Sequence, residues 1–251
     1  MRRARIGVAL VFAIHAAVAG TWAARLPALK AGAGLGNGQL GIALVAMSAG
    51  LLLGTRVAAG AIDRAGSRTV VRGGSLALCA ALILPALGSS LLALSCAFLV
   101  LGAVSGLLDV AMNTQGVEVQ RAYGRPILSG LHGVWSLGGF AGAAAAVALA
   151  GAGVGPLAHF TIVAGILATL GAWASGLLLP GGPRFEPAGA PPHGAAPRSP
   201  WSPAIAVLGV IAFASFLGEG SATDWSAVYL RGELGASASL AAMGFAVSRG
   251  R

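Results

Sequence analysis

The sequence predicts an all-α protein that crosses a membrane several times. Hydrophobic residues make up 57% of the 251 residues and charged residues only 9%, whereas about a quarter of the residues of a soluble domain are charged. The mean hydropathy is +0.84. The 40 glycines lie mainly inside apolar segments, where membrane helices use them for close backbone approach. These observations exclude an ordinary soluble domain.

Composition also excludes several classes of function. The net charge of +9 is compatible with nucleic-acid binding, but the arginines fall in short clusters between apolar runs, as topology determinants do. The chain has no Gly-x-x-x-x-Gly-Lys motif, so we expect no nucleotide-driven pump. Cys79 and Cys96 lack metal-ligand spacing, and we expect both to be small buried apolar residues. We therefore expect no metal, no cofactor and no nucleic-acid partner.

Six apolar segments before residue 180 are long enough to cross a bilayer at about 1.5 Å of rise per residue. A cleaved signal peptide is the alternative for the first, because a basic start and an apolar run fit that pattern too. Its length and the helix-like segments after it favour a span. Residues 1–179 are thus expected to form an amino-terminal six-helix bundle. The six spans cover residues 6–24, 40–62, 69–88, 91–113, 131–154 and 157–179.

The connections are expected to be an outer loop at 25–39, a minimal link at 89–90 and a cytoplasmic loop at 114–129. Three spans carry two glycines four residues apart, a spacing that lets helix backbones touch. These glycines are Gly50 and Gly54, Gly102 and Gly106, and Gly138 and Gly142.

Residues 180–202 contain seven prolines and no apolar periodicity, which predicts a cytoplasmic linker. A seventh span is expected at 203–229 and the start of an eighth at 236–247. Residues 203–251 are therefore expected to begin a second bundle that is truncated.

Lysine and arginine are distributed unequally between the two sides. Ten lie in segments predicted to be cytoplasmic and three in segments predicted to be external, so the positive-inside rule predicts a cytoplasmic amino terminus. The cytoplasmic set is Arg2, Arg3, Arg5, Arg64, Arg68, Arg72, Arg121, Arg125, Arg184 and Arg198, and the external set is Arg25, Lys30 and Arg231.

A charged turn separates the second and third spans. Asp63 is expected to accept hydrogen bonds from a helix N-terminus or to pair with an arginine, and Gly66 to supply a positive φ for a hairpin. Arg64 and Arg68 are expected to hold the turn at the cytoplasmic face. An ordinary basic loop is the alternative. The turn reads Gly60-Ala61-Ile62-Asp63-Arg64-Ala65-Gly66-Ser67-Arg68.

The Asp-Arg-x-Gly-x-Arg run at 63–68 resembles the signature between helices 2 and 3 of major facilitator superfamily (MFS) transporters. The family's first glycine, four residues before Asp63, is replaced by Ala59. Other stretches resemble a bacterial branch related to sugar permeases of the fucose-permease type. They are Trp22-Ala-Ala-Arg-Leu-Pro, Asn113 with Glu118, Gly124-Arg-Pro, Leu131-His-Gly-Val-Trp-Ser-Leu-Gly-Gly, Glu219-Gly and Asp224-Trp-Ser-Ala-Val-Tyr-Leu.

The resemblance implies the MFS fold, in which two six-helix halves rock around a midplane site and the charged turn acts as a conformational gate. It implies a multi-pass protein of the bacterial plasma membrane that carries a small polar, sugar-like solute, with a proton as the candidate coupling ion. Twelve spans need roughly 12 × 20 residues before any loops. The chain is therefore expected to be truncated within its second half and to self-associate or to need a separate carboxy-terminal half.

Polar residues inside the predicted spans are the candidate site residues, because a charge near the centre of a span costs about 2.5–3.5 kcal/mol on insertion scales. His15 and Trp22 lie seven residues apart and share a helical face. They are interpreted as a lumen-facing pair that contacts a solute or relays a proton. The alternative is a neutral histidine bonded to a neighbouring helix.

Arg56 and Asp109 lie at equal depth in the second and fourth spans, which predicts an ion pair between them. Asn113 continues a polar stripe from Asp109. The alternative for Arg56 is snorkelling of its side chain to the interface.

Three further candidates lie nearer the ends of predicted spans. His132 and Trp135 are interpreted as lining the inner mouth of the pathway, with a structural cap as the alternative. Glu219 is an intramembrane carboxylate suited to proton binding if its helix reaches Tyr229. It is an external loop charge if that helix ends near Leu217.

The leading hypothesis is a secondary transporter, and the alternative is a non-transporting membrane fragment or interaction protein. An intramembrane hydrolase built on Ser129, Ser136 and His132 is disfavoured, because no nucleophile turn encloses either serine. We therefore expect no enzyme.

Overall fold

The computed structural model describes residues 1–180 and 203–241, with a few side chains of the last helix, among them Glu219 and Asp224, left outside the description. Every regular element in this part is a helix. Six helical segments are long and apolar enough to cross a membrane, which confirms the prediction of an all-α polytopic membrane protein. They are α1 (Arg2–Ala23), α3 (Asn37–Ala65), α4 (Ser67–Ala81) continued by the 3-10 turn η1 (Leu84–Leu87), α5 (Leu91–Tyr123), α6 (Leu128–Gly151) and α7 (Pro156–Leu177).

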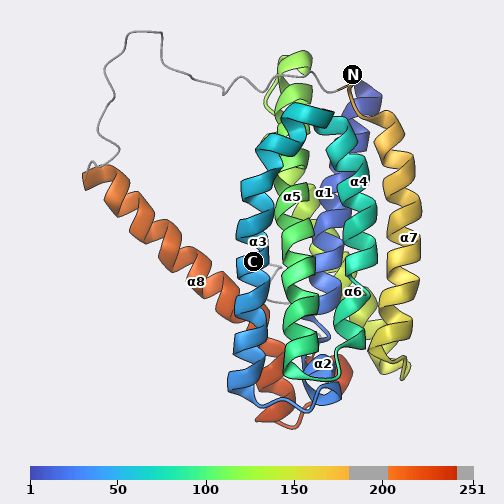
Figure 1. Cartoon of the computed structure of the whole chain (residues 1–251), viewed down its shortest axis with the longest axis vertical. Coiled ribbons are helices and arrows are strands. Elements are labelled where there is room, and N and C mark those ends of the chain that lie inside the picture. The colour runs from blue at the N-terminus through green and yellow to red at the C-terminus, as the bar shows by residue number, and fades with distance from the viewer. Residues whose placement is uncertain (181–202, 242–251) are drawn as a thin grey trace.

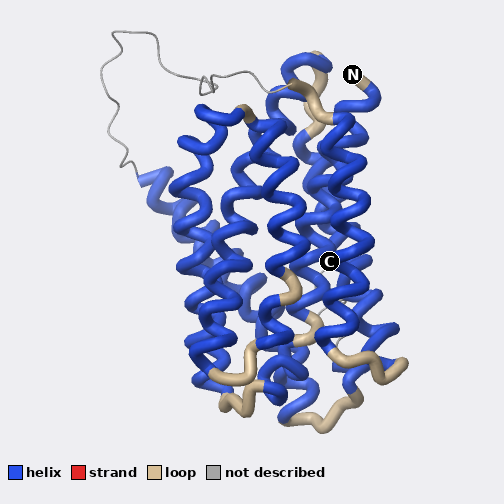
Figure 2. The backbone as a smooth tube through the Cα atoms, turned by 45° about the vertical axis from the view of Figure 1, so that its right-hand side comes forward, coloured by secondary structure: helices blue, strands red, loops and turns tan. Residues whose placement is uncertain are grey.

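These six segments stand side by side as one bundle, and the connections between them gather near its two ends (Figures 1 and 2). The short helix α2 (Leu26–Gly32) lies across one end, which we call the α2 end. The amino terminus lies at the opposite end. Helix α8 (Pro203–Gly232) begins away from the bundle. It reaches the bundle at the α2 end, where it contacts α2 and α1.

Helix α5 corrects one predicted loop. Its N-cap is Ser90, whose hydroxyl accepts from the Ala93 amide at 3.2 Å, and its C-cap is Gly124, which has a φ of +72°. The helix therefore runs for 33 residues, and the loop expected at 114–129 is wrong over its first ten positions. The polar residues of this last part stay helical because several of them hydrogen-bond to other helices.

Other boundaries also differ from expectation. The outer loop at 25–39 contains α2, which begins with Pro27 in its first turn. The turn expected from Gly60 to Arg68 narrows to Gly66, since α3 ends at Ala65 and α4 begins at Ser67. The predicted positive φ at Gly66 is confirmed at +79°. Of the eighth span, only residues up to 241 fall within the described part.

Two helix pairs pack backbone to backbone, as the glycine spacing predicts. A Cβ added at Gly50 would lie 2.1 Å from the Leu99 carbonyl oxygen, and one at Gly54 would lie 2.0 Å from that of Ala103. From the first contact to the second the residue numbers rise by four on both helices, so α3 and α5 are parallel. Gly138 and Gly142 bring α6 against Ala13 and Ala17 of α1 in the same way. Both pairs lie close enough for Cα–H···O contacts between helices.

Candidate functional site

A hydrogen-bonded cluster joins three helices inside the bundle. His15 of α1 is 8% exposed, and its Nε2 lies 2.9 Å from the Ser105 hydroxyl of α5. The indole Nε1–H of Trp135 in α6 donates to His15 Nδ1 at 3.1 Å. Because the indole is only a donor, Nδ1 must accept, and the neutral ring carries its proton on Nε2. The cluster therefore fixes the tautomer of His15.

Helix α5 continues this cluster as a polar stripe. Asp109 and Asn113 follow Ser105 at intervals of four residues, and both are half-buried. The Asn113 amide donates to the Asp109 carboxylate at 3.3 Å and to its backbone carbonyl at 2.9 Å. Asp109 lies near enough to His15 for its charge to act on the imidazole. A neutral imidazole and a carboxylate thus lie close together within an apolar bundle.

The predicted ion pair between Arg56 and Asp109 is wrong. Arg56 is exposed on α3 and has no carboxylate within ion-pair distance among the described side chains, while Asp109 pairs with Asn113. Equal depth in two parallel helices did not bring the two side chains onto facing surfaces. The structure thus shows Asp109 without a basic partner among the side chains that it describes.

Trp22 does not belong to the cluster as expected. It is 6% exposed and packs edge to face on Phe98 of α5, with ring centroids 5.4 Å apart. The aromatic partner of His15 is Trp135, on another helix. His132 is exposed, and its ring packs edge to face with that of Phe12, with ring centroids 5.6 Å apart. That His132 and Trp135 line the inner mouth of the pathway stays a prediction.

Glu219 remains a prediction. Helix α8 continues through this position to Gly232, so the helix does not end near Leu217. The Glu219 side chain lies outside the described residues.

A second polar cluster, which sequence reasoning missed, ties the charged turn to α5. Gln115 is fully buried, and its amide nitrogen lies 2.7 Å from the Ser67 hydroxyl, 2.9 Å from Glu118 Oε2 and 3.2 Å from the Leu179 carbonyl oxygen. Ser67 in turn donates to the Glu118 carboxylate at 3.0–3.1 Å. Carboxylate and carbonyl oxygens only accept hydrogen bonds, so the group of the Gln115 side chain that faces Glu118 and the Leu179 carbonyl must be its NH₂ and not its oxygen. Gln115 and Glu118 lie three residues apart on one helix, but no spacing signal links them to Ser67.

The residues of the turn itself have different surroundings. Arg68 donates to the Ser175 and Gly176 carbonyl oxygens at 3.3 and 3.4 Å, and so binds the last turn of α7. Arg64 donates to the Gly60 carbonyl oxygen within α3 at 3.4 Å. Asp63 is exposed on the last turn of α3, so the N-terminal capping role expected for it is not formed here.

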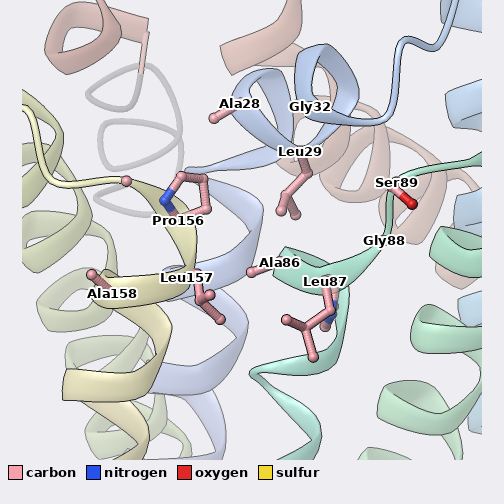
Figure 3. A pocket seen from close by; sticks show the side chains of 12 residues that line it. Ala28, Leu29, Gly32, Ala86, Leu87, Gly88, Ser89, Pro156, Leu157 and Ala158 are labelled. Carbon is pink, nitrogen blue, oxygen red and sulfur yellow. The ribbon is translucent and has the colours of Figure 1, made fainter.

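Two cavities lie at the ends of the bundle, and no residue of the polar cluster lines either of them. One of about 500 Å³ at the α2 end is lined by Leu29, Pro85, Leu87 and Leu157 together with small residues (Figure 3). Its walls carry no charged side chain. Among the described residues, no three His, Cys, Asp or Glu side chains are grouped to hold a metal ion.

Fold and site together define a polytopic membrane protein with polar residues placed between its helices. No family model matches the chain. The chain is 36% identical to an uncharacterized MFS-type transporter of Yersinia pestis over 97% of its own length and 62% of that relative. It is 31% identical to an uncharacterized transporter of Sinorhizobium fredii over 95% of its length and 62% of that relative.

A third relative, the membrane protein MosC of Rhizobium meliloti, is 27% identical over 89% of the chain and 53% of the relative. The chain is thus a relative of MFS-type transporters and spans about three fifths of the length of the first two. Two of the three relatives carry the name of a transporter, and none carries the name of an enzyme.

Proposed function

We propose that the chain contributes the first half of a secondary transporter that moves a small polar, sugar-like solute by alternating access. In this proposal residues 1–179 form the first six-helix half, residues 180–202 the cytoplasmic linker and residues 203–251 the start of the second half. The amino terminus lies on the cytoplasmic side of the bacterial plasma membrane. Membership of the fucose-permease-like branch is part of the same proposal.

The polar cluster on α1, α5 and α6 carries the proposal. Asp109 and Asn113 offer acceptors and donors on a half-buried face, and Trp135 offers an aromatic ring beside His15. Hydroxyl-rich solutes are recognised by such a combination of a few convergent polar groups and an apolar surface. Polar residues within membrane spans commonly mark a solute or ion pathway.

Proton coupling is proposed through His15 and Asp109. Protonated imidazole donates from both nitrogens, so His15 cannot take a second proton while Nδ1 accepts from Trp135. Protonation would therefore release the bond that joins α1 to α6. Uptake of a proton is in this way linked to a contact between two helices that line the site.

The test uses a completed protein, in which the 251-residue chain is joined to the carboxy-terminal part of the Yersinia relative that lies beyond the matched region. It is reconstituted in liposomes with an imposed proton gradient, and the uptake of a panel of hexoses and pentoses is measured. We expect saturable accumulation of at least one of them. Asp109→Asn should lower gradient-driven accumulation at least tenfold, because it removes the charge of the half-buried polar face to which the proposal assigns proton coupling.

Glu233→Gln is the matched control, since it neutralises an exposed carboxylate that follows α8. It should transport like the unmodified protein. Equal accumulation by the Asp109→Asn protein would contradict the assigned role of Asp109. The absence of uptake of every solute by a well-folded completed protein would contradict the proposed function.

A further inference from the structure

Arg25 is a buried cation at the α2 end of the bundle. It lies between α1 and α2, is 5% exposed and donates to the Val154 carbonyl oxygen in the connection between α6 and α7. Its Nε has no hydrogen-bond partner among the described residues. The sequence predicts Arg25 as a charge in an outer loop, where water would surround it. The fold instead removes most of that water.

The charge of Arg25 lacks a counter-ion in the described part of the chain. Burial lowers the pKa of the guanidinium below its ordinary value, but an arginine side chain stays charged at neutral pH. The side chains described around it provide no carboxylate within ion-pair distance. A buried charge without a partner is strongly destabilising. An anion from outside the chain would compensate it.

A second basic group faces the same space. A cavity of about 140 Å³ is lined by Arg25, by Arg231 of the last turn of α8 and otherwise by proline and alanines. Arg231 donates to the Ala236 carbonyl oxygen at 2.7 Å, which leaves its other N–H groups for a ligand. The alanines that line the cavity are Ala24, Ala28, Ala31, Ala150, Ala238 and Ala241.

Beside Arg25 lies a third group without a partner. His159 of α7 is fully buried, and neither of its ring nitrogens has a hydrogen-bond partner among the described residues. It is close enough to Arg25 to feel its charge. Arg25, Arg231 and His159 each offer an N–H donor. The Val154 carbonyl oxygen accepts from one N–H group of Arg25 only.

We propose that the cavity between Arg25 and Arg231 binds a small oxyanion, either a carboxylate or an inorganic ion such as phosphate. Planar guanidinium groups bind two oxygens of such anions at once. A water molecule occupies about 30 Å³ in the liquid, so a cavity of about 140 Å³ has room for an anion of a few non-hydrogen atoms. The site lies ten residues beyond His15, or about 15 Å along a helix, and is independent of the proposed transport site.

The test is the melting temperature of the full 251-residue chain in detergent, titrated with sodium acetate, sodium phosphate or sodium chloride. A ligand that binds the folded state raises the melting temperature in a saturable way. We expect this with an oxyanion. Arg25→Gln and Arg231→Gln should each weaken the apparent affinity at least tenfold. Arg72→Gln, which removes a positive charge from an exposed position on α4, should leave it unchanged.

The ligand panel separates two sources of the same chemistry. Stabilisation by acetate alone supports a carboxylate of an organic solute, whereas stabilisation by phosphate supports an inorganic ion. Arg231 is exposed, so Arg231→Gln keeps the test valid if Arg25→Gln does not fold. The same anion response in Arg231→Gln as in the unmodified chain, or no saturable response to any anion, would overturn the proposal and leave the transport assay unaffected.

Discussion

Replacing Gly142 by alanine is expected to destabilise the bundle strongly. The added Cβ would lie 2.2 Å from the Ala17 carbonyl oxygen and 2.9 Å from its carbonyl carbon. Those atoms are backbone and cannot rotate away, so α1 and α6 must separate. Overpacking of this kind costs about 1–3 kcal/mol, and separation also weakens the bond between His15 and Trp135. The melting temperature in detergent measures the loss.

Gly133→Ala on the same helix is the matched control, because nothing lies within 4 Å of the added Cβ. It should be neutral or stabilising, since alanine favours a helix over glycine by about 1 kcal/mol. Equal melting temperatures for the two variants would show that α1 and α6 do not touch at Gly142.

The 251-residue chain by itself is expected to accumulate no solute against a gradient. In alternating access the site lies between two halves, and one half must rock against the other. The chain spans 62% of the Yersinia relative, so in the proposed arrangement most of the second half is missing from it. The half-buried face with Asp109 and Asn113 is then left without its partner. Such groups are costly against lipid, so we also expect self-association through this face.

The measurement compares the chain alone with the completed protein in the same liposomes and at the same proton gradient. The completed protein should accumulate solute, and the chain alone should only equilibrate it or bind it. Saturable uphill accumulation by the chain alone would contradict the expectation and would show that an assembly of identical copies is sufficient.

The sequence predicts the helices well because their physical signals are local. Apolar length identifies the six spans, and glycines four residues apart identify the faces of α3 and α5 that touch. Gly66 breaks the chain between α3 and α4 because only a glycine takes a φ of +79° without strain. These features depend on residues that are close in the sequence.

The site is predicted less well because its contacts join different helices. Depth along a span does not fix the direction of a side chain around its helix axis, so the pairing of Arg56 with Asp109 failed. The spacing of seven residues predicted that Trp22 pairs with His15. The aromatic partner of His15 is instead Trp135, which is 120 residues away in the sequence. Ser105 lies four residues before Asp109 and Gln115 three before Glu118, but their contacts with His15 and Ser67 come only from helix packing.

The most direct test of the account asks whether the polar stripe of α5 lies on a water-accessible path. Asn113→Cys in a completed protein without Cys79 and Cys96 is treated with a membrane-impermeant thiol reagent. Val100→Cys on the same helix is the control, because Val100 is 44% exposed and lies on the side of α5 away from Asp109. We expect that Asn113→Cys reacts, that a transported solute slows the reaction and that Val100→Cys stays unreactive. An Asn113→Cys protein as unreactive as the Val100→Cys protein would contradict this expectation.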